Sequence, residues 1–145
     1  MKKELKIAEI FALEKKSRLE LPIFSTRISA GFPSPADDYI ENKLDLNEFL
    51  IQHPSATFFV RVEGDSMTEA GINSGDLLVV DRALEAVNNS IVVAIINGEF
   101  TVKRISKTRG KIFLRPENPD FKALEITPEM DFKIWGRVSY VIHKF

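Results

Sequence analysis

Residues 91–105 read Ile91-Val92-Val93-Ala94-Ile95-Ile96-Asn97-Gly98-Glu99-Phe100-Thr101-Val102-Lys103-Arg104-Ile105. Two strand-like runs flank Asn97-Gly98, and this arrangement is the strongest short signal for a β-hairpin. The first run is wholly apolar, which indicates a strand buried on both of its faces. One of the two adjacent cations in the second run, Lys103 or Arg104, is therefore expected to point into the interior.

Further short strands are predicted on both sides of this hairpin. Residues 57–62 and 76–81 come before it, and residues 111–115 and 133–143 follow it. Short strands separated by turns are typical of closed or partly closed β-structures. The sequence thus predicts a mostly β fold of short antiparallel strands, preceded by an extended or partly helical N-terminal arm.

The N-terminal third carries weaker signals. Residues 1–20 fit either a short amphipathic helix or a frayed arm, and the proline-containing residues 21–35 favour an extended segment. Ser34-Pro35 predicts a helix start, with the helix reaching about Leu44 and a further turn over residues 47–51. The expected organisation is an arm (1–30), a linker with a short helix (31–55) and a β-rich domain (56–145).

Composition excludes several classes of function. The 145 residues include no cysteine, so disulfides, thiolate catalysis and cysteine-based zinc sites are impossible, and a reducing cytoplasm is the expected location. The net charge of −1 comes without a concentrated basic face, which argues against sequence-specific DNA binding. No segment approaches the ~18 to 20 apolar residues of a membrane span. His53 and His143 have no acid near them in sequence, so no metal or cofactor is expected.

Ser66 has the surroundings of an activated hydroxyl. It lies in Val62-Glu63-Gly64-Asp65-Ser66-Met67 at the end of an apolar run, where Gly64 permits a sharp bend after a strand. We expect a helical turn to start near Ser66, leaving its hydroxyl exposed and the backbone N–H groups of Ser66 and Met67 able to hold an oxyanion. Taken alone, the motif favours a simple helix cap.

Lys103 is the candidate base for this hydroxyl. It shares one face of its predicted strand with Thr101 and Ile105. A free lysine has a pKa of about 10.4, so a lysine base must be buried to lose its proton near neutral pH. A lysine that only snorkels at the edge of the sheet is the alternative. A serine and a neutral lysine together form a known nucleophile–base pair.

A candidate substrate lies in the same chain. Ser29-Ala30-Gly31-Phe32-Pro33 combines two small residues with a proline that keeps Phe32 extended. Extended peptides dock on proteases by adding a strand to a sheet edge. The Ala30-Gly31 bond is therefore the predicted cleavage site, and a plain proline-rich linker is the alternative.

Three blocks of this sequence together resemble the LexA/UmuD family of self-cleaving serine–lysine peptidases. They are residues 30–35, residues 62–81 and residues 98–104. Residues 32–57 are most similar to the UmuD branch of that family. LexA-type repressors carry a DNA-binding domain before the cleavage site, whereas thirty residues precede it here.

The resemblance implies a fold, a site and partners. It implies a LexA-like catalytic domain in which Ser66 is the nucleophile, Lys103 is the general base and Ala30-Gly31 is cut. Cutting would be stimulated by RecA filaments on single-stranded DNA, as part of the SOS response. The product, residues 31–145, would form a homodimer and serve a UmuC-type error-prone translesion polymerase.

Two other functions stay open at this point. One is a polymerase-binding module that never cuts itself, and the other is a LexA-like repressor or phage regulator without its DNA-binding domain. The sequence also leaves open whether cutting occurs within one chain or between two.

Overall fold

The computed structural model describes residues 3–12, 20–24 and 40–145, and it describes only the backbone of residues 20–24 and 40–44. The chain forms two compact units, one made of Met1–Leu13 with His53–Phe145 and the other of Glu14–Gln52. In the second unit β2 (Glu20–Phe24) pairs antiparallel with β3 (Ile40–Asp45), and the short helix α1 (Leu46–Leu50) follows.

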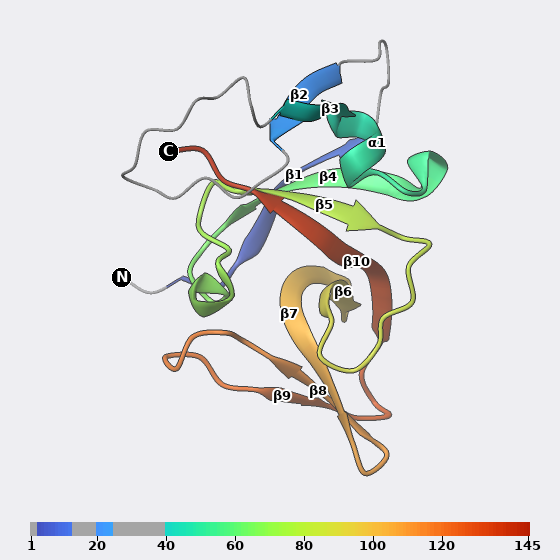
Figure 1. The fold of residues 1–145 in the computed structure, drawn as a ribbon. Helices are drawn as coiled ribbons and strands as arrows, with labels where there is room; N and C mark the ends of the chain where they lie inside the picture. Colours follow the sequence, from blue (N-terminus) through green and yellow to red (C-terminus); the bar gives the residue numbers. More distant parts are fainter. Residues whose placement is uncertain (1–2, 13–19, 25–39) are drawn as a thin grey trace. The chain divides into compact units, whose positions relative to one another are not determined.

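The first unit is a curled eight-stranded antiparallel sheet (Figure 1). Its spatial order is β1-β4-β5-β10-β6-β7-β8-β9. The strands are β1 (Lys6–Ala12), β4 (Thr57–Glu63), β5 (Leu77–Asp81), β6 (Ile91–Ile96), β7 (Glu99–Thr108), β8 (Lys111–Arg115), β9 (Leu124–Ile126) and β10 (Phe132–Ile142). Short 3₁₀ helices span Pro54–Ala56 and Thr68–Ala70. The predicted mostly β, LexA-like fold is confirmed.

The hairpin predicted at Asn97-Gly98 is present. β6 and β7 pair with Ile96 opposite Glu99, which leaves a two-residue turn. Asn97 has a φ of 49° and Gly98 a φ of 83°. Positive φ at both central residues matches the right-handed twist of the two strands, and Asn and Gly adopt it at least cost.

β10 lies in the middle of the sheet although it is the last strand in sequence. It pairs antiparallel with β5 on one side and with β6 on the other. Each pairing contains one register shift, near Tyr140 and near Gly136 respectively. Such irregularities bend a strand and increase its twist. β10 therefore joins the strands before residue 82 to those after residue 90.

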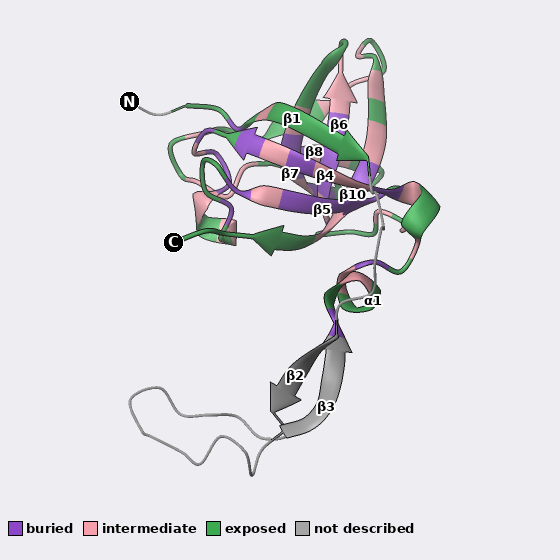
Figure 2. Cartoon of the chain, turned by 90° about the horizontal axis from the view of Figure 1, so that it is seen from above, coloured by how far each residue is buried: buried purple, intermediate pink, exposed green. Residues whose placement is uncertain are grey.

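Buried apolar side chains of the sheet form two clusters. The larger cluster comprises Leu5, Val60, Val62, Met67, Ile72, Leu78, Val80, Val93 and Val102, and the smaller one Val92, Ala94, Ile105 and Leu114. Figure 2 shows buried positions on β4, β5 and β7, while β1 is mostly exposed. Leu5, just before β1, is nevertheless only 1% exposed.

The described part of residues 1–20 is extended rather than helical, and the helix expected to reach Leu44 is wrong. Within residues 1–20 the described part forms strand β1, because its backbone pairs with the outer edge of β4 and the apolar pattern is too weak to favour a helix. The helix expected to reach Leu44 is replaced over residues 40–45 by β3, which pairs with β2. Residues 34–39 lie outside the described part.

The turn predicted over residues 47–51 is confirmed as α1, which the Asp45 side chain caps by accepting a 3.0 Å hydrogen bond from the Asn47 N–H. Among the described residues, no helix has the length and apolar character needed to cross a membrane.

Candidate active site

Ser66 and Lys103 lie side by side, although 37 residues separate them in sequence. Ser66 follows β4 after a bend, and Lys103 lies in the middle of β7. The Lys103 Nζ is 3.3 Å from the Ser66 Oγ. Ser66 is fully buried and Lys103 is 8% exposed. Of the two adjacent cations, Lys103 is thus the one that is buried, as the sequence allowed.

Neighbouring atoms of β7 hold the Lys103 amine in place. Nζ is 2.9 Å from the Thr101 Oγ1 and 3.2 Å from the Val102 carbonyl oxygen. Thr101 was not among the predicted site residues. The alternation of side chains along a strand places it on the face of Lys103, so the sequence contained the signal needed to include it.

A carboxylate also pairs with this amine. Glu4, just before β1, forms an ion pair and hydrogen bond with the Lys103 Nζ. Burial lowers the pKa of Lys103 from its ordinary value of 10.5, while the hydrogen bond and the charge of Glu4 act in the opposite direction. An ammonium has three donors. Glu4, Ser66, Thr101 and the Val102 carbonyl therefore compete for them.

The Ser66 hydroxyl was expected to be exposed, and it is buried. Residues 3–5 cover it: the Leu5 N–H donates a 3.0 Å hydrogen bond to the Ser66 Oγ. Two further hydrogen bonds join Lys3 to Asp65, the residue before Ser66. The Asp65 N–H donates to the Lys3 carbonyl oxygen over 2.6 Å, and the Lys3 N–H donates to the Asp65 carboxylate over 3.2 Å. The expectation failed because the covering segment lies more than 60 residues away in sequence.

Gly64 is needed both for the bend and for this cover. Its backbone φ of +118° is rarely adopted by residues that have a side chain. A Cβ at this position would lie 2.1 Å from the Glu4 carbonyl oxygen and 2.6 Å from the Leu5 Cα. The absent side chain therefore lets residues 3–5 approach the backbone next to Ser66.

The segment after β8 supports the Ser66 turn from the other side. The Glu117 N–H donates to the Ser66 carbonyl oxygen over 2.8 Å, and the Asn118 Nδ2 donates to the Asp65 carbonyl oxygen over 2.8 Å. Arg104, next to the candidate base, forms an ion pair with Glu117. The sequence analysis missed Glu117 and Asn118, and no local pattern marks them.

A helical turn does follow Ser66, starting two residues later than predicted. It is the 3₁₀ helix Thr68–Ala70, with Met67 as the residue before it. The oxyanion role of the Ser66 and Met67 N–H groups stays a prediction. Ala30 and Gly31 lie outside the described residues, so the structure does not place the predicted cleavage site.

Both histidines have acidic partners that sequence proximity did not indicate. The His53 Nδ1 is 2.6 Å from the Asp81 carboxylate, and the His143 Nδ1 is 2.5 Å from the Asp76 carboxylate. Asp76 and Asp81 lie at opposite ends of β5 and are buried. Within the described part of the chain, no group of three or more potential ligands could hold a metal ion.

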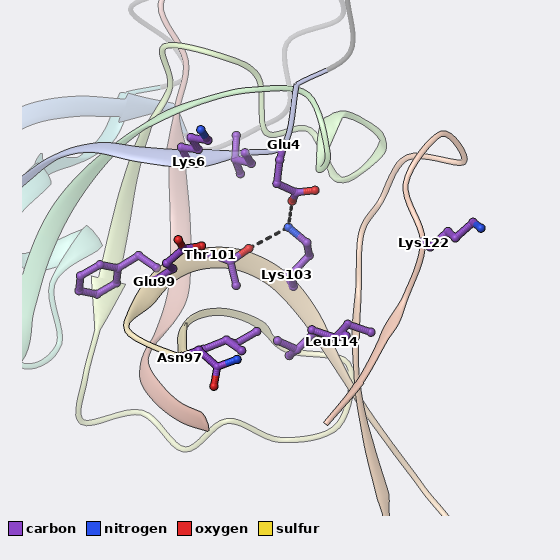
Figure 3. Close-up of a pocket in the computed structure, with 12 residues that line it drawn as sticks. Glu4, Lys6, Asn97, Glu99, Thr101, Lys103, Leu114 and Lys122 are labelled. Carbon is purple, nitrogen blue, oxygen red and sulfur yellow. Dashed lines mark hydrogen bonds and ion pairs between the residues drawn. The ribbon is translucent and has the colours of Figure 1, made fainter. Parts of the chain in front are cut away.

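A cavity of about 510 Å³ opens beside Lys103. Glu4, Thr101 and Lys103 form one part of its wall, and Phe100, Leu114 and Leu124 give it an apolar part. In Figure 3 the Glu4 carboxylate points at the Lys103 amine, whereas Lys6 and Lys122 point away from it. The buried amine therefore has polar partners on one side and open space on another.

Comparison with known proteins agrees with this arrangement of fold and site. Residues 22–139 match the family described as Peptidase S24-like. The chain is 51% identical to protein SamA of Salmonella typhimurium over 123 residues, or 85% of each chain. It is 48% identical to protein MucA of Escherichia coli over 134 residues, or 91% of each chain. It is also 40% identical to the LexA repressor of Paracidovorax citrulli, over 83% of this chain and 53% of the repressor. With a family match over most of its length and relatives near half identity, the chain belongs to the Peptidase S24-like family, on its UmuD-like branch.

Proposed function

We propose that this chain cuts itself at Ala30-Gly31, with Ser66 as the nucleophile and Lys103 as the general base. The observation that carries the proposal is the buried contact of 3.3 Å between the Lys103 Nζ and the Ser66 Oγ. Burial lowers the pKa of Lys103, so a larger share of this amine is neutral at a given pH than for a free lysine. Membership of a peptidase family supplies the reaction class.

The reaction follows from the two groups. Neutral Lys103 takes the hydroxyl proton as the Ser66 oxygen attacks the Ala30 carbonyl carbon. The N–H groups of Ser66 and Met67 would stabilise the oxyanion that forms. The Lys103 ammonium then donates its proton to the departing Gly31 nitrogen as the peptide bond breaks. Water, deprotonated by the same amine, hydrolyses the Ala30 ester and restores Ser66.

The biological role is proposed from the resemblance to UmuD-like proteins. RecA filaments on single-stranded DNA would stimulate the cut, and residues 31–145 would then act as a homodimeric accessory subunit of an error-prone translesion polymerase. The match to the proteins SamA and MucA over most of each chain supports this branch over the repressors.

The test is the intact mass of the purified chain after incubation at about pH 9 to 10, where more of Lys103 is neutral. Fragments of about 30 and 115 residues are expected from the 145-residue chain. Ser66→Ala and Lys103→Ala should each abolish them. Ser106→Ala, another buried serine, and Lys107→Ala, an exposed lysine on the same strand, are the matched controls and should cut normally.

Cutting that persists in Ser66→Ala and Lys103→Ala would refute the mechanism. A chain that also stays intact with RecA, ATP and single-stranded DNA would support the non-cleaving polymerase-binding module instead. Tight retention on one duplex DNA sequence would support a regulator.

A further inference from the structure

Residues 3–5 lie against the Ser66 hydroxyl that the scissile bond must reach. On the proposed function, the Ala30 carbonyl carbon must come within about 3 to 3.5 Å of the Ser66 Oγ. The Leu5 nitrogen already lies 3.0 Å from that oxygen. Because two segments cannot fill the same space, the form described here cannot cut its own chain.

These residues are held by a continuous set of contacts. β1 pairs with the outer edge of β4 from Lys6 opposite Glu63 to Ala12 opposite Phe58. Leu5 enters the larger core cluster and is 1% exposed. Gly64 leaves the space that the Glu4 carbonyl occupies. Residues 3–12 therefore have a binding site made of a sheet edge, a core pocket and the Ser66 turn.

Glu4 adds an electrostatic contact to this packing. The charged groups that line the cavity beside Lys103 are Glu4, Lys6, Glu99 and Lys122. Among these, Glu4 is the one whose carboxylate pairs with the amine. Arg104, on the other face of β7, pairs with Glu117. The Glu4 carboxylate favours the ammonium form of Lys103, and an ammonium cannot accept the Ser66 proton.

We propose that residues 3–12 form an inhibitory strand, which binds the edge of β4 and closes the catalytic pair through Glu4 and Leu5. This inference rests on the proposed function. The strand lies upstream of Ala30-Gly31 in the same chain, so it must leave the Ser66 turn before that bond can enter. The observed rate of cutting is then reduced by the fraction of molecules in the open form. A partner that holds residues 3–12 away from β4 would accelerate the cut.

The test compares Glu4→Gln with Glu9→Gln. Both variants remove one carboxylate from the inhibitory strand, but Glu9 pairs with Arg61 at 3.2 Å, away from the catalytic pair. At about neutral pH, Glu4→Gln should cut about 3- to 10-fold faster than the parent, an effect moderated by the partial exposure of Glu4. Glu9→Gln removes only an exposed ion pair between this strand and β4, so it should change the rate by no more than about 2-fold.

Two further readouts separate a structural effect from an electrostatic one. Removal of the Glu4 carboxylate lets burial lower the pKa of Lys103 further, so the rise of rate with pH should move to lower pH. In a Ser66→Ala background, which cannot cut, hydrogen exchange over residues 3–12 should be faster with Glu4→Gln than with Glu9→Gln.

The outcomes distinguish this inference from the proposed function. If Glu4→Gln cuts no faster than the parent, or if Glu9→Gln accelerates the cut equally, the inhibitory strand is refuted while the peptidase can stand. Unchanged exchange over residues 3–12 in Glu4→Gln also refutes it. Cutting in Ser66→Ala would refute the peptidase mechanism itself.

Discussion

Replacement of Leu5 by alanine probes the inhibitory strand without changing any charge. Leu5 is 1% exposed and packs in the larger core cluster with Val60 and Met67. Removing a buried leucine side chain costs about 2 to 5 kcal/mol when its surroundings stay in place. On the proposal above, residues 3–5 leave the core while the rest of the sheet stays folded. We therefore assign the lower end of that range, about 2 kcal/mol, to the closed form relative to the open form.

A change of about 2 kcal/mol corresponds to about a 30-fold shift in the equilibrium between closed and open forms. As long as the closed form still predominates, Leu5→Ala should cut itself faster than the parent by up to that factor. The assay is intact mass against time at one pH. Ile10→Ala is the matched control, because Ile10 lies on β1 but is 41% exposed, and its effect should stay within about 2-fold.

The reasoning is refuted if Leu5→Ala cuts at the rate of Ile10→Ala, or more slowly than the parent. Thermal unfolding of the same variants in the Ser66→Ala background checks that the sheet remains folded. Leu5→Ala with a normal unfolding transition and an unchanged rate would show that residues 3–5 do not limit access to Ser66.

Two further predictions concern the proposed base and the turn that carries the proposed nucleophile. In a Ser66→Ala background, Lys103→Met should raise the free energy of unfolding, and by more at neutral than at alkaline pH. Burial lowers the pKa of Lys103 in the folded chain below 10.5. Between that lowered pKa and 10.5, the unfolded chain therefore binds more protons than the folded chain. The free energy of unfolding of the protein with Lys103 thus rises with pH across this window. Urea unfolding at several pH values measures this difference, and a difference that does not shrink toward pH 10.5 would contradict it. Asn118→Ala removes the 2.8 Å hydrogen bond to the Asp65 carbonyl and should slow self-cleavage by about 3- to 10-fold. Asn88→Ala, whose partner is the exposed Lys107 N–H, is the control, and equal rates for the two variants would rule out a positioning role for Asn118.

The strands of the sheet were predictable because their signals are local. The apolar run 91–96, the Asn97-Gly98 turn and the alternation along residues 133–143 each specify a strand or hairpin without reference to distant residues. The three-residue strand β9 was missed because it is too short to show a period. β1 was missed because its stability comes from pairing with β4, about 50 residues further along the chain.

The residues of the site were predictable only in part, because some of them meet through contacts between distant parts of the sequence. Ser66 and Lys103 stand in recognisable surroundings, and the structure brings them together. Glu4, Leu5 and Glu117 contact them through folding alone, since no spacing in the sequence relates residues 4 and 5 to residue 66. The N-terminal arm carries the predicted cleavage site, which stays a prediction, and residues 4 and 5 of the same arm contact both catalytic candidates.

The position of β10 has a consequence for the order of events during synthesis. In the described sheet, hydrogen bonding connects β4, which precedes Ser66, to β7, which carries Lys103, through β10, the last of these strands to be synthesised. A nascent chain that ends before Phe132 has both reactive residues but lacks the strand that joins their two halves. Any self-cutting should therefore begin only after β10 has been added to the sheet.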